Sequence, residues 1–372
     1  MPKSLVANMR RMQRMMRPAK LTKKSQSILI ASAFAPFAVA KPKRKAKSQT
    51  SVAGHALGMM VTNMRAAQGM MPGARQPATT RAVVPSVPKG AQYLSRTHRC
   101  VQGARGYKLY LPASAPKHPN GLIVMLHGCG QDPDDFALGT HMNAIAEKHG
   151  LAVAYPAQTR RHNAGGCWNW FAPAHQSRGL GEPAILASLT RKLTRELDLG
   201  RDQVYVAGLS AGGAMAAILV DVYPDVFAAA GIHSGLARGA ARDVSSAMGA
   251  MRSGAPGGVA PAVIRKNNSP VRRIIFQGDG DGTVHLSNAQ HLVTAALGAD
   301  PVAARVTRNA VRKIGYTRSD FGADGDLVAL ELWVLDGAGH AWSGGRAAGS
   351  YTDTKGPDAS AQMVRFFLAA SR

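Results

Sequence analysis

The feature of the sequence that most constrains the fold is a short strand-like run that leads directly into Gly-Leu-Ser-Ala-Gly at positions 208–212. The β-branched and aromatic residues at 204–206 favour a strand, and the small residues that follow the motif favour a helix. A serine on a sharp turn between a strand and a helix points its hydroxyl outward, and glycines beside it avoid collisions with both elements. Ser210 is therefore the candidate nucleophile. The N–H of Ala211, at the expected helix N-terminus, is a candidate oxyanion donor.

Strand-like and helix-like segments alternate along the chain from residue 93 onward. The sequence predicts strands at 107–111, Gly121–Leu126, 151–155, 203–207, 226–232, 271–276 and Leu327–Leu335, with helices such as 182–197 and 289–297 between them. Such alternation is typical of an α/β fold with a mainly parallel sheet and helices on both faces. Ligands of these folds sit at the carboxyl ends of the strands.

Two of those strand ends carry further candidate chemistry. Asp279 and Asp281 follow the strand at 271–276, and Asp336 and His340 follow Leu327–Leu335. The chain order serine, acid, histidine is that of α/β-hydrolases, in which histidine accepts the serine proton and the acid orients the imidazole. We therefore assign Ser210, Asp281 and His340 to these roles.

The sequence leaves alternatives for the acid and for the other histidines. Asp279 lies two residues before Asp281 and is the second candidate, unless its side chain caps the turn. Asp336 shares a strand end with the candidate base and is expected to organise that loop. The histidines outside this arrangement are expected to make structural hydrogen bonds to loop backbone. They include His127, His233 and His285.

A glycine-bearing loop follows the buried strand Gly121–Leu126. It reads His127-Gly128-Cys129, and its backbone N–H groups are candidates for the second oxyanion donor, with Cys129 the preferred one.

Five segments of the chain closely resemble the poly(3-hydroxybutyrate) depolymerase family of esterases. They are Leu-His-Gly-Cys at 126–129, Cys-Trp-Asn-Trp-Phe at 167–171, Gly-Leu-Ser-Ala-Gly-Gly-Ala-Met at 208–215, His-Ser-Gly at 233–235 and Gly-His-Ala-Trp-Ser-Gly-Gly at 339–345. The resemblance covers about residues 93–370. It implies an α/β-hydrolase with Ser210, Asp281 and His340 as catalytic triad and the amides of Cys129 and Ala211 as oxyanion hole.

The resemblance also implies a substrate class. Family members act on short-chain 3-hydroxyalkanoate polyesters or oligoesters, and related members cleave feruloyl or acetyl esters on plant polysaccharide. Secreted polymer-degrading members continue into a linker and a substrate-binding domain, whereas 32 residues follow His340 here. We therefore expect oligomers, amorphous polymer or small esters as substrates, rather than crystalline polymer.

Cysteine and tryptophan usage adds three expectations. By resemblance, Cys129 and Cys167 form a disulfide that braces the oxyanion loop, which leaves Cys100 free. No Cys/His spacing indicates a metal site, and the chemistry requires no cofactor. An aromatic surface near the site would suit an aliphatic ester, unless its members belong to the core. The candidate substrate-binding residues are Trp168, Trp170 and Trp342.

The N-terminal part of the chain, residues 1–90, differs from the rest. No Asp or Glu precedes Asp132, so most of the formal net charge of +25 comes from the front of the chain. Residues 132–372 carry a formal net charge of only +3, and this near-neutral body argues against nucleic-acid binding. We predict residues 91–372 to be the catalytic domain. We expect the basic, Met-rich extension to be largely disordered apart from an amphipathic helix within residues 1–24 that contacts a granule or membrane surface.

An apolar run at 27–40 follows basic residues and ends in Ala-Val-Ala, the order of a secretory signal. The sequence thus predicts export to the extracellular space or periplasm. The alternatives are an intracellular, granule-associated protein, or an extension without function.

Several functions therefore compete. The leading one is a serine esterase that forms an acyl-enzyme, and its rivals among enzymes are a feruloyl or acetylxylan-type esterase and, more remotely, a serine peptidase. A non-catalytic granule-binding protein is the alternative from another class. The sequence does not fix the oligomeric state or the acyl chain length.

Overall fold

The computed structural model describes residues 83–254, 271–312, 314–324 and 327–369. Residues 1–82 of the predicted extension lie outside this part, and so do its predicted helix and export signal. The strands are β1 (Gln92–Cys100), β2 (Gly103–Leu111), β3 (Gly121–Leu126), β4 (Leu151–Pro156), β5 (Val204–Leu209), β6 (Ala229–His233), β7 (Arg272–Gly278), β8 (Arg305–Val311), β9 (Ile314–Asp324), β10 (Leu327–Leu335), β11 (Trp342–Ser343) and β12 (Thr352–Asp353). The helices are α3 (Pro133–Thr140), α4 (Met142–His149), η2 (Pro173–His175), α5 (Gly181–Glu196), η3 (Arg201–Gln203), α6 (Ala211–Val222), α7 (Val244–Ser253), α8 (Ser287–Leu297) and α9 (Ala359–Leu368).

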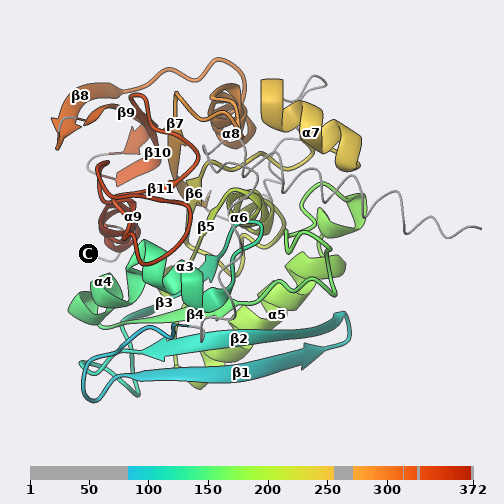
Figure 1. Ribbon diagram of the computed structural model, residues 1–372, viewed down its shortest axis with the longest axis vertical. Helices are drawn as coiled ribbons and strands as arrows, with labels where there is room; N and C mark the ends of the chain where they lie inside the picture. The colour runs from blue at the N-terminus through green and yellow to red at the C-terminus, as the bar shows by residue number, and fades with distance from the viewer. Residues whose placement is uncertain (1–82, 255–270, 313, 325–326, 370–372) are drawn as a thin grey trace, which may run out of the picture. The chain divides into compact units, whose positions relative to one another are not determined.

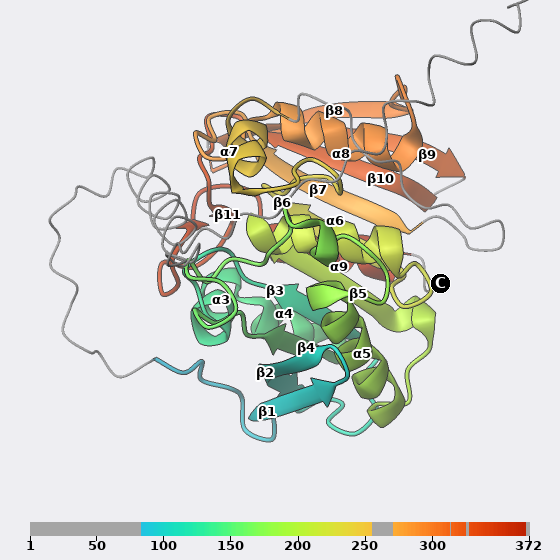
Figure 2. The ribbon, with the colours of Figure 1, turned by 90° about the vertical axis from the view of Figure 1, so that its right-hand side faces the viewer.

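Ten of the strands form one sheet in the order β1-β2-β4-β3-β5-β6-β7-β10-β9-β8 (Figure 2). The six central strands, from β4 to β10, pair in parallel, whereas the outer pairings are antiparallel. Strands β3, β4, β5 and β7 are buried at every position, as expected when helices cover both faces of a parallel sheet.

Helices cover both faces of this sheet. Figure 1 shows α3, α4 and α9 on one side of the strands and α5, α6, α7 and α8 on the other. Each side has its own apolar core: Ile123 and Met125 of β3 face α4 and α9, and Val124 of the same strand faces α6. The predicted α/β-hydrolase architecture, a mainly parallel central sheet between two helical layers, is confirmed.

The outer strands β1, β8 and β9 were not predicted. β8 is exposed along its whole length, and β1 is mostly exposed. They pair in antiparallel fashion and lack the continuous apolar run by which buried strands are recognised.

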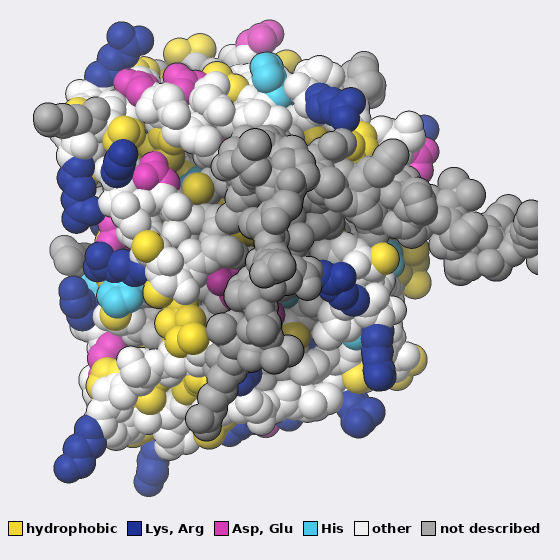
Figure 3. Space-filling view, viewed as in Figure 1, with side chains coloured by type: hydrophobic (Ala, Val, Ile, Leu, Met, Phe, Trp, Pro, Cys, Tyr) yellow, Lys and Arg dark blue, Asp and Glu magenta, His cyan; other side chains and the backbone are white. Residues whose placement is uncertain are grey.

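Charge on the visible face does not form a stripe. In Figure 3, the described Lys and Arg side chains lie scattered along the margins among Asp and Glu. Among the helices of the described ranges, none combines the length and the apolar composition required to cross a bilayer.

Candidate active site

Ser210 occupies a strained turn between β5 and α6. Its φ of 58° and ψ of −120° lie in a region that side chains other than glycine rarely adopt. The surrounding backbone approaches so closely that a Cβ on Gly208 would lie 2.4 Å from the carbonyl carbon of Gly212, and one on Gly212 would lie 2.0 Å from the oxygen of Leu126. The two glycines of the motif are thus required sterically, as the sequence predicts.

The pairing register brings the ends of the central strands to one edge of the sheet. Leu209, the last residue of β5, pairs with His233, which pairs with Phe276 of β7. The last residues of β7 and β10, Gly278 and Leu335, also pair with each other. The loops that follow these strands carry Ser210, Asp281 and His340, so the three candidate residues are presented at the same edge.

Asp281 and His340 form a buried pair. The Nδ1–H of His340 donates to Oδ2 of Asp281 over 2.8 Å, so Nε2 is the nitrogen that accepts a proton. The other oxygen, Oδ1, accepts the N–H groups of Thr283 and Val284, each at 2.8 Å. Burial raises the pKa of Asp281, but the charge and hydrogen bond of His340 and the two amides outweigh it and hold the pKa below its ordinary value. The carboxylate is thus ionised and fixed toward the imidazole.

The other two acids near these strand ends have different surroundings. Oδ1 of Asp279 accepts the N–H of Gly337 at 2.5 Å, which links the loops after β7 and β10. The side chain of Asp279 is thus bonded to the neighbouring loop, rather than to the backbone of its own turn. Asp336 is exposed and its N–H donates to the oxygen of Gly315.

The loop after β3 lies against Ser210. A Cβ on Gly128 would lie 3.7 Å from the Cβ of Ser210. The side chain of Gln131 accepts the N–H of Gly128 and donates to Asp135, which fixes the loop onto α3. The first N–H groups of a helix have no acceptor one turn earlier, so α6 presents the amide of Ala211 beside the same serine.

The structure contains the disulfide that the resemblance implied. Cys129 is bonded to Cys167, and Cys100 is a free thiol at the end of β1. The bond ties the loop after β3 to the Cys-Trp-Asn-Trp segment, as expected.

Glu182 also braces that segment, a role the sequence did not indicate. Its side chain is 1 % exposed, accepts the backbone N–H of Asn169 at 2.7 Å and pairs with Arg105 at 3.1 Å. The amides of Gln158 and Asn169 also donate to Oε1, at 2.5 and 2.8 Å. Burial raises the pKa of Glu182, but the hydrogen bonds from His175 and Asn169 outweigh burial and hold the pKa below its ordinary value. The carboxylate is therefore ionised.

The three other histidines singled out in the sequence make structural hydrogen bonds, as predicted. Nε2 of His127 accepts the N–H of Gln158, and Nδ1 of His285 accepts that of Ser287. His233 has the most contacts: its backbone oxygen accepts the N–H of Ser210, and its Nε2 accepts that of Ser343. Burial and the nearby His340 lower the pKa of His233 to about 3. It is therefore neutral and links the serine turn to the histidine loop.

The predicted aromatic substrate surface is wrong for all three tryptophans. Trp168, Trp170 and Trp342 are at most 2 % exposed and belong to the apolar cores. The indole N–H of Trp168 donates to the oxygen of His127, and that of Trp342 donates to Ser360. The polar groups of these two rings are satisfied inside the protein, and all three rings are part of the packed core.

Nothing in the described ranges resembles a metal centre. There, no group of three or more His, Cys, Asp or Glu side chains is arranged to hold an ion.

Comparisons with known proteins converge on one family. Residues 105–322 match the family model described as Esterase PHB depolymerase. Poly(3-hydroxyalkanoate) depolymerase C of Paucimonas lemoignei is 33% identical over 190 residues, which cover 49% of this chain and 44% of the relative. Poly(3-hydroxybutyrate) depolymerase of Ralstonia pickettii is 38% identical over 141 residues, 35% of this chain and 28% of the relative. The chain thus spans less than half the length of these two relatives.

Carbohydrate esterases match as well. Probable acetylxylan esterase A of Aspergillus clavatus is 26% identical over 251 residues, which cover 63% of this chain and 79% of the relative. Among solved structures, the acetyl xylan esterase from Aspergillus awamori aligns with a TM-score of 0.52 at 20% identity, over 67% of this chain and 93% of that one. This likeness supports the fold.

Proposed function

The chain belongs to the PHB depolymerase family of esterases, and from that membership we propose that it is a serine esterase that cleaves short-chain 3-hydroxyalkanoate oligoesters. The observation that carries the proposal is the buried hydrogen bond of 2.8 Å between His340 and Asp281, at the sheet edge where Ser210 sits on its strained turn. An imidazole oriented in this way can act as general base for a serine hydroxyl presented at the same edge of the sheet.

In the proposed mechanism, Nε2 of His340 takes the proton of Ser210 as Oγ attacks the ester carbonyl. The new C–O bond forms an acyl-enzyme, and the same proton passes to the leaving alcohol. The amides of Ala211 and Cys129 stabilise the negative charge on the carbonyl oxygen. Water then attacks the acyl group, again with His340 as base, and releases the acid.

The first test is burst kinetics with p-nitrophenyl butyrate. We expect an initial burst of about one equivalent of p-nitrophenol per site. The burst and the turnover are lost in Ser210→Ala, whereas Ser253→Ala, at the exposed end of α7, matches the parent protein. Turnover that persists in Ser210→Ala would remove the proposal.

Acetylxylan or feruloyl ester hydrolysis is the second candidate. It is favoured by the match to the acetylxylan esterase, which covers more of this chain than either depolymerase match does. The two candidates are separated by kcat/KM for a 3-hydroxybutyrate trimer, acetylated xylo-oligosaccharides and feruloylated arabinose. The oligoester is expected to have the highest value, and a preference for either sugar ester would favour the second candidate.

A non-catalytic granule-binding role is tested by sedimentation with amorphous polyhydroxybutyrate. If residues 1–24 contact the granule, the full chain sediments with the polymer and a chain of residues 91–372 does so less. Equal sedimentation would leave those residues without this role. Export is a separate proposal, and loss of about the first 40 residues from the mature protein, measured by mass spectrometry, would support it.

A further inference from the structure

A small pocket lies at the end of α6 away from Ser210. Its cavity volume is about 180 Å³, and Arg178, Arg238, Asp221, Val222 and Pro224 contribute to its wall. Since α6 begins at the residue after Ser210 and has 12 residues, the pocket is about 18 Å from the serine along the helix. It is therefore separate from the candidate active site.

Arginines outnumber aspartates around this pocket. Asp221 pairs with Arg238 at 3.3 Å and with Arg273 at 2.6 Å. A second carboxylate, Asp225, is bonded in the same way to Arg178 at 2.5 Å and Arg191 at 2.8 Å. Each carboxylate thus meets two guanidinium groups, and the cluster retains excess positive charge that favours an anion.

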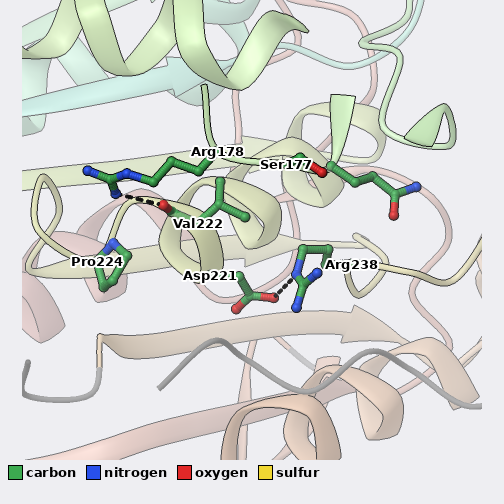
Figure 4. Close-up of a pocket in the computed structure, with 7 residues that line it drawn as sticks. Ser177, Arg178, Asp221, Val222, Pro224 and Arg238 are labelled. Atoms are coloured by element: carbon green, nitrogen blue, oxygen red, sulfur yellow. Dashed lines mark hydrogen bonds and ion pairs between the residues drawn. The ribbon is translucent and has the colours of Figure 1, made fainter. Parts of the chain in front are cut away.

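Arg178 is the guanidinium best placed to meet a ligand. Its Nη1 donates to Val222 and Asp225, and its Nη2 donates to Asp225. These bonds fix the plane of the group but do not use all of its N–H donors. The side chain is 36% exposed, and the hydroxyl-bearing Ser177 beside it is exposed as well. Figure 4 shows Arg178 and Arg238 reaching the end of α6 from two sides, with Val222 between them.

Two residues make part of the wall apolar. Val222 and Pro224 offer hydrocarbon next to the guanidinium of Arg178. A fully charged inorganic anion gains nothing from such a surface, whereas a carboxylate with a short alkyl chain places its charge on the arginine and its carbons on the apolar wall. The volume is below the range of roughly 300–1,000 Å³ typical of drug-sized ligands, which restricts the ligand to a few carbons.

We propose that this pocket binds a short-chain carboxylate, of the class that the candidate active site releases when it cleaves an ester. The link to that product rests on the proposed function; the binding itself does not. Gln176, also in the wall, donates to the oxygens of Trp170 and Ala241. The pocket wall is therefore joined to the segment that follows Cys167.

The test is titration of the full chain with butyrate, followed by NMR of the ligand and by calorimetry. Butyramide, which has the same shape without the charge, and inorganic phosphate are the comparison ligands. We expect saturable binding of butyrate, no saturable binding of butyramide, and weaker binding of phosphate. Absence of saturable butyrate binding, equal binding of butyramide, or a preference for phosphate would each overturn the carboxylate assignment.

Variants locate the binding. Arg178→Gln is expected to weaken butyrate binding about tenfold. Arg191→Gln is the matched control, because it removes the other ion pair of Asp225 without altering the pocket wall. Equal weakening in both variants would show that butyrate binding depends on the ion pairs of Asp225 and not on the pocket wall. The proposal would then be wrong.

A second pair of variants leaves the ion pairs intact. Ser177→Asp places a negative charge on the pocket wall and is expected to reduce butyrate affinity, whereas Ser177→Asn is expected to retain it. Unchanged affinity in Ser177→Asp would place the butyrate elsewhere. Because binding is measured without turnover, a chain that binds butyrate at Arg178 but fails the burst test would lose only the proposed esterase function.

Discussion

Asp281 and Glu182 are both buried carboxylates whose pKa lies below its ordinary value, yet they hold different parts of the molecule. Asp281 is fixed by two loop amides and orients one imidazole. Glu182 joins groups from three separate segments, through Arg105, Gln158 and Asn169. The first carboxylate orients the proposed base, and the second holds the segment that is bonded to the proposed oxyanion loop. Mutation of the first should therefore reduce catalysis, and mutation of the second should reduce stability.

The largest effect is expected for Asp281→Asn. The amide no longer selects the imidazole tautomer or stabilises the imidazolium, so kcat on p-nitrophenyl butyrate should fall by about 10³ to 10⁴. The melting temperature should change little by comparison. Asp279→Asn is the matched control, because an amide oxygen still accepts the N–H of Gly337. If Asp281→Asn kept full activity and Asp279→Asn lost it, Asp279 and not Asp281 would be the acid that orients His340.

Glu182→Gln should reverse this pattern. It leaves the buried guanidinium of Arg105 without a counter-charge and should lower the free energy of unfolding by about 3–5 kcal/mol. The kcat of the folded fraction should fall much less than in Asp281→Asn. The measurement is urea denaturation, and Glu196→Gln is the control. Glu196 lies on the same helix and also forms ion pairs, but its side chain is 40% exposed. Equal stability of the two variants would contradict the bracing role.

Removal of the disulfide is a second test of the scaffold, because the disulfide and Glu182 hold the same segment in place. Replacing Cys129 and Cys167 by serine releases a link between residues 38 positions apart and should cost about 3 kcal/mol in chemical denaturation. Cys100→Ser should be neutral. Combined with Glu182→Gln, the double replacement should destabilise less than the sum of the separate effects, because both braces hold one segment. Strict additivity would mean that they act independently.

The last effect is the dependence of stability on pH. The pKa of His233 is about 3 in the folded protein, whereas an unfolded histidine binds a proton below about pH 6.5. The unfolded state therefore gains protons first as the pH falls between these values, and stability declines by up to about 1.4 kcal/mol per pH unit. In His233→Gln, urea denaturation from pH 7 to pH 4 should give a shallower decline. Parallel curves for the variant and the parent would contradict the neutral, buried state.

The sequence predicted those elements whose signal is local. The strands Gly121–Leu126 and Leu327–Leu335 have the predicted bounds because both are unbroken or nearly unbroken apolar runs. β8 carries only exposed side chains, so its pairing with β9, rather than its composition, makes it a strand. Edge strands of this kind form because they pair with a neighbouring strand, and the local sequence pattern does not predict that pairing.

The same distinction applies to the site. Ser210 was located from the steric demand of one turn, and Asp281 and His340 from their places after strands. The contacts of Glu182 with Arg105 and Asn169 join residues 77 and 13 positions apart and leave no motif. The tryptophans were misassigned because proximity to a motif does not distinguish a ring that faces the ligand from one that supports the loop. Trp342, for example, packs on His233 with its N–H bonded to Ser360.

His233 links two loops of the candidate site. Its backbone receives the amide of Ser210 while its ring receives the amide of Ser343, three residues beyond His340. The serine turn and the loop of His340 are therefore coupled through one buried side chain and its backbone. We expect the separation of Ser210 and His340 to survive warming that already loosens the exposed outer strands.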